Sequence, residues 1–122
     1  MPPPSVLAAL VVLARPRGTW LVALLPVVGF GYGLWERGST VAPSVVAPTV
    51  GALFAAWLTG HAGALWLNAA RDRDRGPVLL GRTVPVPPLA APAGYAALAG
   101  SAGLAALVGP GPAACAAGCA LG

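Results

Sequence analysis

Residues 47 to 75 have the sequence APTVGALFAAWLTGHAGALWLNAARDRDR, in which an apolar stretch runs directly into alternating arginine and aspartate. No charged residue occurs from Gly38 to Ala70, a run of 33 residues. A helix that crosses the hydrocarbon core of a bilayer needs about 20 apolar residues, each adding a rise of about 1.5 Å. The stretch therefore predicts a membrane-spanning helix near residues 47–69 that ends in a charged loop.

The composition of the whole chain supports the same class of protein. Of its 122 residues, 57% are hydrophobic and only 8% are charged, and the mean hydropathy is +0.80. Ordinary soluble domains carry about 25% charged residues, so a soluble globular domain, a disordered tail and a coiled coil are excluded. The net charge of +4 comes from arginines that lie between apolar stretches, which argues against a nucleic-acid-binding protein. We expect an all-α membrane protein.

Two further stretches of the chain, residues 18–35 and 83–122, also lack charge. They add two spanning helices, so that three transmembrane helices are predicted near residues 18–36, 47–69 and 88–108. A truncated fourth span occupies residues 113–122 and is too short to cross a bilayer. We therefore expect a single membrane domain over residues 1–122 that forms the amino-terminal part of a larger helical bundle.

The amino-terminal segment differs from a secretory signal. Its apolar stretch, Val6 to Ala14, is followed by Arg15 and Arg17, whereas a signal carries its positive charge before the apolar core. We interpret residues 5–14 as a short interfacial helix; the alternative is that they begin the first span. The sequence Arg-Pro-Arg-Gly from Arg15 then predicts a break at the water boundary.

The arginines predict the orientation in the membrane. Six of the seven flank the amino-terminal side of the first span or lie in the loop after the second span, and Arg37 alone lies in the loop between them. Cytoplasmic loops carry an excess of Arg and Lys. We therefore expect a protein of the cytoplasmic (inner) membrane whose amino terminus and Asp/Arg loop are cytoplasmic.

Three polar residues of the second span form a stripe. Asn68 and Asp72 are four positions apart and share a helix face, and His61 lies two turns before Asn68 on nearly the same line. Polar and ionisable groups within a span are costly, so they are candidates for a functional site. For His61 alone, the competing interpretation is a packed, hydrogen-bonded side chain.

The chemistry of this stripe suits a magnesium diphosphate. An amide oxygen and a carboxylate one turn apart are hard ligands, and Mg²⁺ is usually held by such groups together with waters and substrate phosphates. Guanidinium groups match phosphate oxygens, and the adjoining loop supplies four of them: Arg71, Arg73, Arg75 and Arg82. The alternative is that alternating Arg and Asp simply form a solvated cytoplasmic loop.

Asn68-Ala-Ala-Arg-Asp72, at the end of an apolar span, resembles the first aspartate-rich motif, NxxxDxxxD, of the UbiA superfamily of intramembrane prenyltransferases. The segment Gly81-Arg-Thr-Val-Pro-Val-Pro87 is similar to that family's arginine-proline segment before the third helix. The chain from Ala14 to Trp20, followed by Leu24-Leu-Pro26, is similar to the family's start of helix one. The resemblance runs in order along nearly the whole chain.

The resemblance implies a helical bundle, usually of nine spans, whose central cavity opens to lipid. It implies Mg²⁺-dependent transfer of an isoprenoid group from a polyprenyl diphosphate to an aromatic or similar lipophilic acceptor. Carried onto this sequence, Asn68 and Asp72 become metal ligands, and Arg82 and Arg75 become diphosphate-binding residues. His61 becomes a candidate cavity-lining residue.

The sequence departs from the family pattern in two places. The position four after Asp72 is Gly76, so the metal ligand there would be Asp74, two residues along, if the helix unwinds before Gly76-Pro77. No acidic residue follows Asp74, so the second aspartate-rich motif is missing. We expect the chain alone to be inactive and to need the remaining helices of the bundle.

Two alternatives to an enzyme stay open. The first is a small non-enzymatic integral membrane protein, a subunit or assembly factor, whose Arg-rich cytoplasmic loop binds anionic lipid. The second, a transporter fragment, is weaker because no repeat is present. In every case we expect close helix packing by small residues of the third span, such as Gly100, Gly103 and Ala106, and packing roles for Cys115 and Cys119.

Overall fold

The computed structural model describes residues 5–38, 40–72, 78–79, 82–83 and 85–121. Within these residues the chain is mainly helical, and one short pair of antiparallel strands is present. In chain order the elements are α1 (Val6–Leu13), α2 (Pro16–Ala23), α3 (Leu25–Glu36), α4 (Pro43–Arg71), β1 (Val78–Leu79), β2 (Arg82–Thr83), α5 (Ala90–Ala106) and α6 (Pro110–Leu121). The prediction of a helical protein is confirmed, and the hairpin was not predicted.

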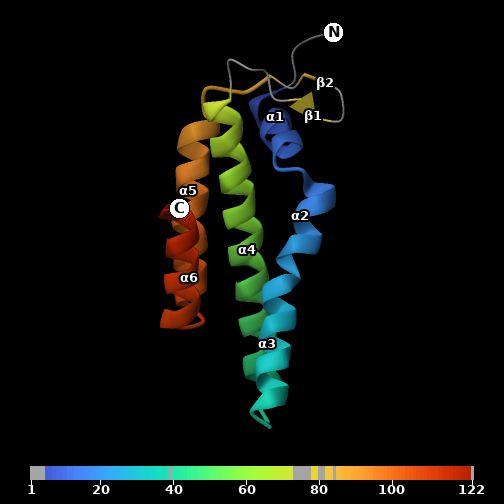
Figure 1. Cartoon of the computed structure of the whole chain (residues 1–122), viewed down its shortest axis with the longest axis vertical. Coiled ribbons are helices and arrows are strands. Elements are labelled where there is room, and N and C mark those ends of the chain that lie inside the picture. Colours follow the sequence, from blue (N-terminus) through green and yellow to red (C-terminus); the bar gives the residue numbers. More distant parts are fainter. Residues whose placement is uncertain (1–4, 39, 73–77, 80–81, 84, 122) are drawn as a thin grey trace.

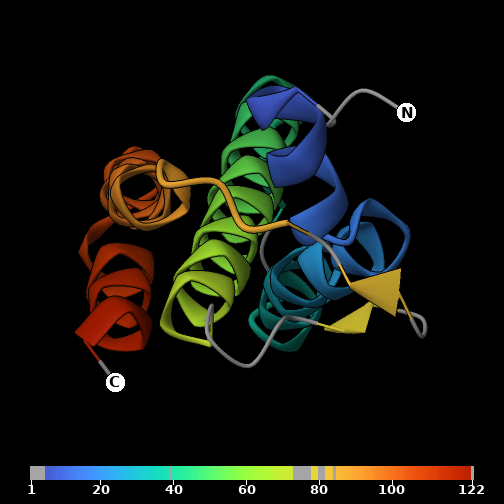
Figure 2. The same ribbon diagram turned by 90° about the horizontal axis from the view of Figure 1, so that it is seen from above.

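The long helix α4 lies at the centre of the bundle. Figure 1 shows α5 and α6 on one side of α4 and α2 and α3 on the other, and the view along the bundle in Figure 2 agrees. α1 lies beside the carboxyl-terminal end of α4. The start of α2 and the end of α4 lie toward the same end of the molecule (Figure 1). The cytoplasmic orientation of this end stays a prediction.

The first predicted span is broken into α2 and α3 at Leu24. Pro26 lies at the second position of α3 and has no backbone N–H to donate to the carbonyl four residues earlier, so a continuous helix is interrupted there. The two helices together still form one apolar stretch, Pro16–Glu36, of 21 residues. The break redirects α3 relative to α2 as it follows α4 (Figure 1).

The helix α4 is longer than predicted at both ends. Pro43 occupies its first position, where a missing N–H costs nothing and the fixed φ of proline suits a helix. Pro48 lies inside the first two turns without ending the helix. At the other end, the backbone N–H of Asp72 donates to the carbonyl of Asn68 over 3.0 Å and completes the last turn.

The tightest packing in the described chain joins α4 to α5. A Cβ placed on Gly63 would lie 2.8 Å from the carbonyl oxygen of Gly94, and one placed on Gly94 would lie 2.9 Å from the carbonyl oxygen of Gly63. Ser101 is buried there, and its hydroxyl donates to the carbonyl of Ala56 over 2.7 Å. Small residues allow the two backbones to approach this closely.

Close packing by small residues of the third span was predicted, but the three residues named for it do not provide it. Gly100 and Gly103 are exposed, and a Cβ added at either position would meet no neighbouring atom within 4 Å. Ala106 is exposed as well. The buried residues of α5 lie on a different face of the helix from Gly100, Gly103 and Ala106. They are Ala90, Gly94, Ser101 and Ala105. Composition alone does not distinguish the two faces, because both are rich in small residues.

The helix α1 is separate from α2 and is held against α4; its position at a membrane interface stays a prediction. Arg15 adopts a left-handed backbone conformation with φ of 50° and separates the two helices just before Pro16. The indole N–H of Trp66 on α4 donates to the carbonyl of Leu10 on α1 over 2.8 Å. Ala9 and Leu13, on the same helix, are buried. The first helix is thus docked on the bundle.

Two helical stretches are long and apolar enough to cross a membrane, Pro16–Glu36 and Pro43–Arg71. Large apolar side chains along the first of them are exposed, including Leu25, Val28 and Trp35, which is 77% exposed. In water such a surface would be unfavourable. These features suggest a membrane-associated helical protein; a third span in α5, which has 17 residues, stays a prediction.

Candidate functional site

The polar stripe predicted from the sequence lies on α4. Because α4 runs without interruption to Arg71 and is capped by Asp72, the spacings of seven and four residues place His61, Asn68 and Asp72 along one face. At about 100° per residue, Asn68 and Asp72 are separated by about 40° and His61 and Asn68 by about 20° around the helix axis. The stripe runs from the middle of the bundle to the end of α4.

The two candidate metal ligands are open to solvent at that end. Asn68 and Asp72 are both exposed, and within the described part of the chain neither side chain makes a hydrogen bond or an ion pair. The carboxyl-terminal end of a helix carries a partial negative charge. The helix dipole therefore favours a cation beside Asp72.

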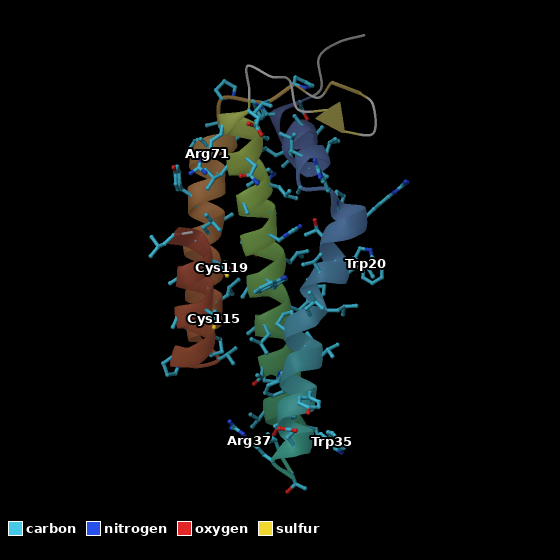
Figure 3. All side chains as sticks on the ribbon, in the orientation of Figure 1. Trp20, Trp35, Arg37, Arg71, Cys115 and Cys119 are labelled. Carbon is cyan, nitrogen blue, oxygen red and sulfur yellow. The ribbon has the colours of Figure 1, made fainter. Side chains whose placement is uncertain are left out.

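The other predicted binding residues are only partly placed. Asp74 and Arg75 lie outside the described residues. Arg82 belongs to β2, whose backbone pairs antiparallel with β1 so that Arg82 lies opposite Leu79. In both views the hairpin lies on the side of α1 and α2, away from α5 and α6 (Figures 1 and 2). Arg71, labelled in Figure 3, lies at the end of the bundle where α4 ends and where the hairpin is also found.

A cavity of about 460 Å³ adjoins the stripe. Four helices contribute to its wall: α3 through Phe30, α4 through Trp57 and His61, α5 through Leu98, and α6 through Cys115. Its volume lies within the range of about 300–1,000 Å³ that is typical of small-molecule sites. The cavity lining includes His61 and Ala64 but neither Asn68 nor Asp72, so the polar end of α4 lies outside the cavity.

Few polar groups reach this cavity. Ser101 lines it, but its hydroxyl is already donated to the carbonyl of Ala56. The indole nitrogen of Trp57 is buried and has no hydrogen-bond partner among the described residues. The side chain of His61, one turn further along α4, has no hydrogen bond within the described part of the chain either. Two nitrogen-bearing rings of α4 are thus left without partners in an otherwise apolar cavity.

The role of Trp57 was not predicted from the sequence. The spacing of four residues between Trp57 and His61 is the signal that would have placed the two on one face of the second span. The cysteines also differ from the prediction. Cys115 and Cys119 are exposed, line the cavity and lie on the edge of α6 that faces α4 (Figure 3). They are therefore not buried between helices in the described part of the chain.

The donor set for a metal ion is small. Across the residues that the structure describes, no group of three His, Cys, Asp or Glu side chains lies close enough to hold a metal ion. Asn68 and Asp72 offer an amide oxygen and a carboxylate on consecutive turns at a helix carboxyl terminus. This pair fits Mg²⁺ that keeps most of its waters and shares substrate oxygens, and it does not form a complete protein cage.

Comparisons with known proteins give no assignment for this chain: no protein family, curated protein or solved structure matches it. The site must therefore be interpreted from its own geometry.

Proposed function

We propose that the chain contributes the isoprenoid diphosphate site of a UbiA-like intramembrane prenyltransferase. The supporting observation is the arrangement along α4, where an apolar cavity lies below an exposed amide and carboxylate on the same helix. Ala64 lines the cavity and Asn68 is the next residue along that face, one turn away. A rise of 1.5 Å per residue separates them by about 6 Å along the axis.

This arrangement matches an amphiphile with a strongly anionic head. A prenyl diphosphate has a hydrocarbon tail and a compact head with several negative charges. The cavity offers apolar walls from α3 to α6, and the end of α4 offers Asn68 and Asp72 with the arginines of the following loop. In the proposal the tail lies in the cavity and the head lies at the end of α4.

The proposed roles of the residues follow from their chemistry. Asn68 and Asp72 hold Mg²⁺, with Asp74 as a third ligand, and Arg75 and Arg82 bind diphosphate oxygens through their guanidinium groups. Bound Mg²⁺ supplies neutralisation of the negative charge that develops on the leaving diphosphate. The cavity walls exclude water from the prenyl group, so that an acceptor rather than water takes it.

The rest of the site must come from elsewhere in the bundle. No acidic residue follows Asp74 in the sequence, and a UbiA-like enzyme uses a second aspartate-rich motif. We therefore propose that further helices complete the metal site and cover the open side of the cavity. The described chain alone is expected to bind the prenyl diphosphate weakly and not to turn it over.

The proposed membrane arrangement follows the arginines. α2 with α3, α4 and α5 are the three spans, α6 is the partial fourth, and the ends that carry Arg17 and Arg71 face the cytoplasm. In this arrangement the diphosphate head lies at the cytoplasmic surface of the inner membrane. The tail and the lipophilic acceptor lie within the bilayer.

Binding of farnesyl diphosphate to the full chain in lipid nanodiscs tests the proposal. We expect Mg²⁺ to strengthen binding, and Asp72→Asn to weaken the Mg²⁺-dependent part by at least about tenfold, because a metal carboxylate is lost. Glu36→Gln is the matched control: Glu36 is also an exposed carboxylate at a helix end, but it lies at the opposite end of the bundle and accepts from the hydroxyl of Tyr32. Equal Mg²⁺-dependent binding by Asp72→Asn and the wild type would disprove the metal role.

A non-enzymatic role as a subunit or assembly factor is the second candidate. The close backbone approach of Gly63 and Gly94 favours it, since packing of this kind is what a structural membrane subunit requires. In that case the loop arginines bind anionic lipid headgroups. Binding to phosphatidylserine nanodiscs that is unaffected by Mg²⁺ and by Asp72→Asn, together with no binding of farnesyl diphosphate, would favour this second function.

A further inference from the structure

The two thiols of the chain lie on one face of α6, at the wall of the cavity. Cys115 and Cys119 are exposed, neither is in a disulfide, and both line the cavity. They are four positions apart within α6, so they stand on consecutive turns of the same face (Figure 3). The proposed diphosphate site at the end of α4 uses neither thiol, so the pair requires an explanation of its own.

The spacing of the two thiols does not suit a disulfide but suits a bridging ion. Side chains four positions apart on a helix have Cβ atoms about 5–6 Å apart, whereas a disulfide needs a Cβ separation of about 3.5–4.5 Å. Two sulfur–metal bonds in a line, each of about 2.3 Å as in zinc thiolates, separate the sulfurs by about 4.6 Å. One ion therefore fits between Cys115 and Cys119 without a change in the helix.

The surroundings of the pair limit the ion to one that needs only two protein ligands. His61 lines the same cavity from α4, but no group of three His, Cys, Asp or Glu side chains in the described part of the chain lies close enough to hold an ion. Structural Zn²⁺ sites use four such ligands. Thiolates select soft ions, and the soft ions that accept two ligands in a line are Cu⁺, Ag⁺ and Hg²⁺.

Charge distinguishes between these ions. Two thiolates carry two negative charges, and none of the described residues that line the cavity is Arg, Lys, Asp or Glu. A monovalent ion leaves one negative charge on the complex, and an uncompensated charge is costly in apolar surroundings. A divalent ion gives a neutral complex, so the cavity favours it over a monovalent one.

We infer that Cys115 and Cys119 form a two-coordinate site for a soft divalent cation of the Hg²⁺ type. In the binding step two S–H bonds break, two sulfur–mercury bonds form and two protons leave to the solvent, with no change in oxidation state. The inference goes beyond the proposed function, because the site on α6 requires neither Mg²⁺ nor a diphosphate.

Two mercury probes test whether the thiols bind one ion together. Hg²⁺ can bridge two thiolates, whereas methylmercury binds only one. The full chain is titrated in nanodiscs that hold one chain each, which excludes bridging between chains, and the ultraviolet charge-transfer absorbance of the mercury thiolate is followed. We expect saturation at one Hg²⁺ per chain and at two methylmercury ions per chain. Saturation at two Hg²⁺ per chain would overturn the inference.

A relocated thiol provides the matched control. The double variant Cys119→Ser/Ala117→Cys keeps two thiols, but Ala117 is exposed, does not line the cavity and lies about 200° around the helix from Cys115. Removal of half the bound Hg²⁺ should need at least about tenfold more 2-mercaptoethanol in the wild type, because its second thiolate acts within the same chain at a high effective concentration. Equal removal from both chains would contradict a site set by the face of α6.

Protection of the thiols from a maleimide tests the number of ligands. Hg²⁺ should block labelling of both cysteines, whereas Zn²⁺ at the same concentration should not, because two thiolates leave half of its usual ligand set unfilled. Equal protection by Zn²⁺ would overturn the two-coordinate site. Loss of Mg²⁺-dependent farnesyl diphosphate binding would overturn only the proposed function.

Discussion

The two faces of α4 differ in how they are packed, although they lie on one helix and have similar compositions. Toward α5, Gly63 meets Gly94 so closely that neither position has space for a methyl group. Toward α3 and α6, larger side chains such as Trp57 and His61 border a cavity of about 460 Å³. Small residues thus close one interface of the bundle, while Trp57 and His61 lie beside a cavity on the other.

We expect the face of α4 toward α5 to contribute most to stability and the face beside the cavity to contribute most to binding. Close backbone approach and the buried hydrogen bond of Ser101 hold α4 and α5 together. The cavity adjoins this interface, since Ala56 and Ser101 line it as well, and its remaining wall comes from larger side chains of α3, α4 and α6. Substitutions on the first face should therefore change stability, and substitutions on the second face should change ligand or reagent access.

The largest effect is expected for Gly63→Leu. A side chain at this position would collide with the carbonyl of Gly94 and with Ala97, whose Cβ lies 3.0 Å from the added Cβ. Overpacking of this kind costs about 1–3 kcal/mol and can exceed it when backbone atoms must move. Thermal unfolding in detergent should show a clear loss of stability. Gly100→Leu, on the open face of α5, should leave the unfolding temperature nearly unchanged. An equal loss of stability in both variants would show that the close contact between α4 and α5 does not determine the effect.

A smaller and more local effect is expected for Trp66→Phe. This change removes the 2.8 Å hydrogen bond to the carbonyl of Leu10, which is worth about 1 kcal/mol. Since that bond joins α1 to α4, amide hydrogen exchange should accelerate in α1 and stay unchanged in α5. If the exchange rate in α1 is the same in Trp66→Phe as in the wild type, α1 is held only by its buried side chains, Ala9 and Leu13.

Ser101→Ala should have a still smaller effect. It removes the hydrogen bond to Ala56 but keeps the small volume that the interface requires. Hydrogen bonds between membrane helices contribute about 0.6 kcal/mol on average. Thermal unfolding should detect a slight loss compared with Thr49→Ala, in which only an exposed bond within α4 is removed. A loss as large as that of Gly63→Leu would show that the hydrogen bond, not the glycine contact, dominates this face.

The smallest change in stability is expected for Ala64→Leu on the cavity face. Ala64 is exposed and lines the cavity, so the free energy of unfolding should change by no more than about 0.5 kcal/mol. The added side chain should instead slow the reaction of Cys115 and Cys119 with a lipophilic maleimide. Unchanged labelling would show that these thiols are reached from outside the cavity.

The helical fold was largely predictable because it depends on the distribution of charge. The uncharged runs placed α4 and α5 to within a few residues, and Arg15-Pro16 placed the start of α2. The break at Leu24 was missed, although Pro26 is its visible cause. The hairpin of β1 and β2 was missed because strands of two residues have no measurable periodicity.

The site was predictable only where a single helix determines it. The common face of His61, Asn68 and Asp72 follows from helix geometry along α4 and needs no knowledge of other helices. The cavity needs α3, α5 and α6 in place, and their contacts are set by tertiary packing. For the same reason the small residues of α5 named from the sequence do not provide the close packing, and the sequence assigned Cys115 and Cys119 the wrong surroundings.

The hydrogen bond between Trp66 and Leu10 also has a consequence for biosynthesis. Its partners are 56 residues apart in the sequence, and chains emerge from the ribosome at about 5–20 residues per second. The first helix therefore waits about 3–11 seconds before the indole that anchors it has been made. During that interval its apolar side chains have no protein surface to dock on, so the membrane or the insertion machinery has to shield them until α4 arrives.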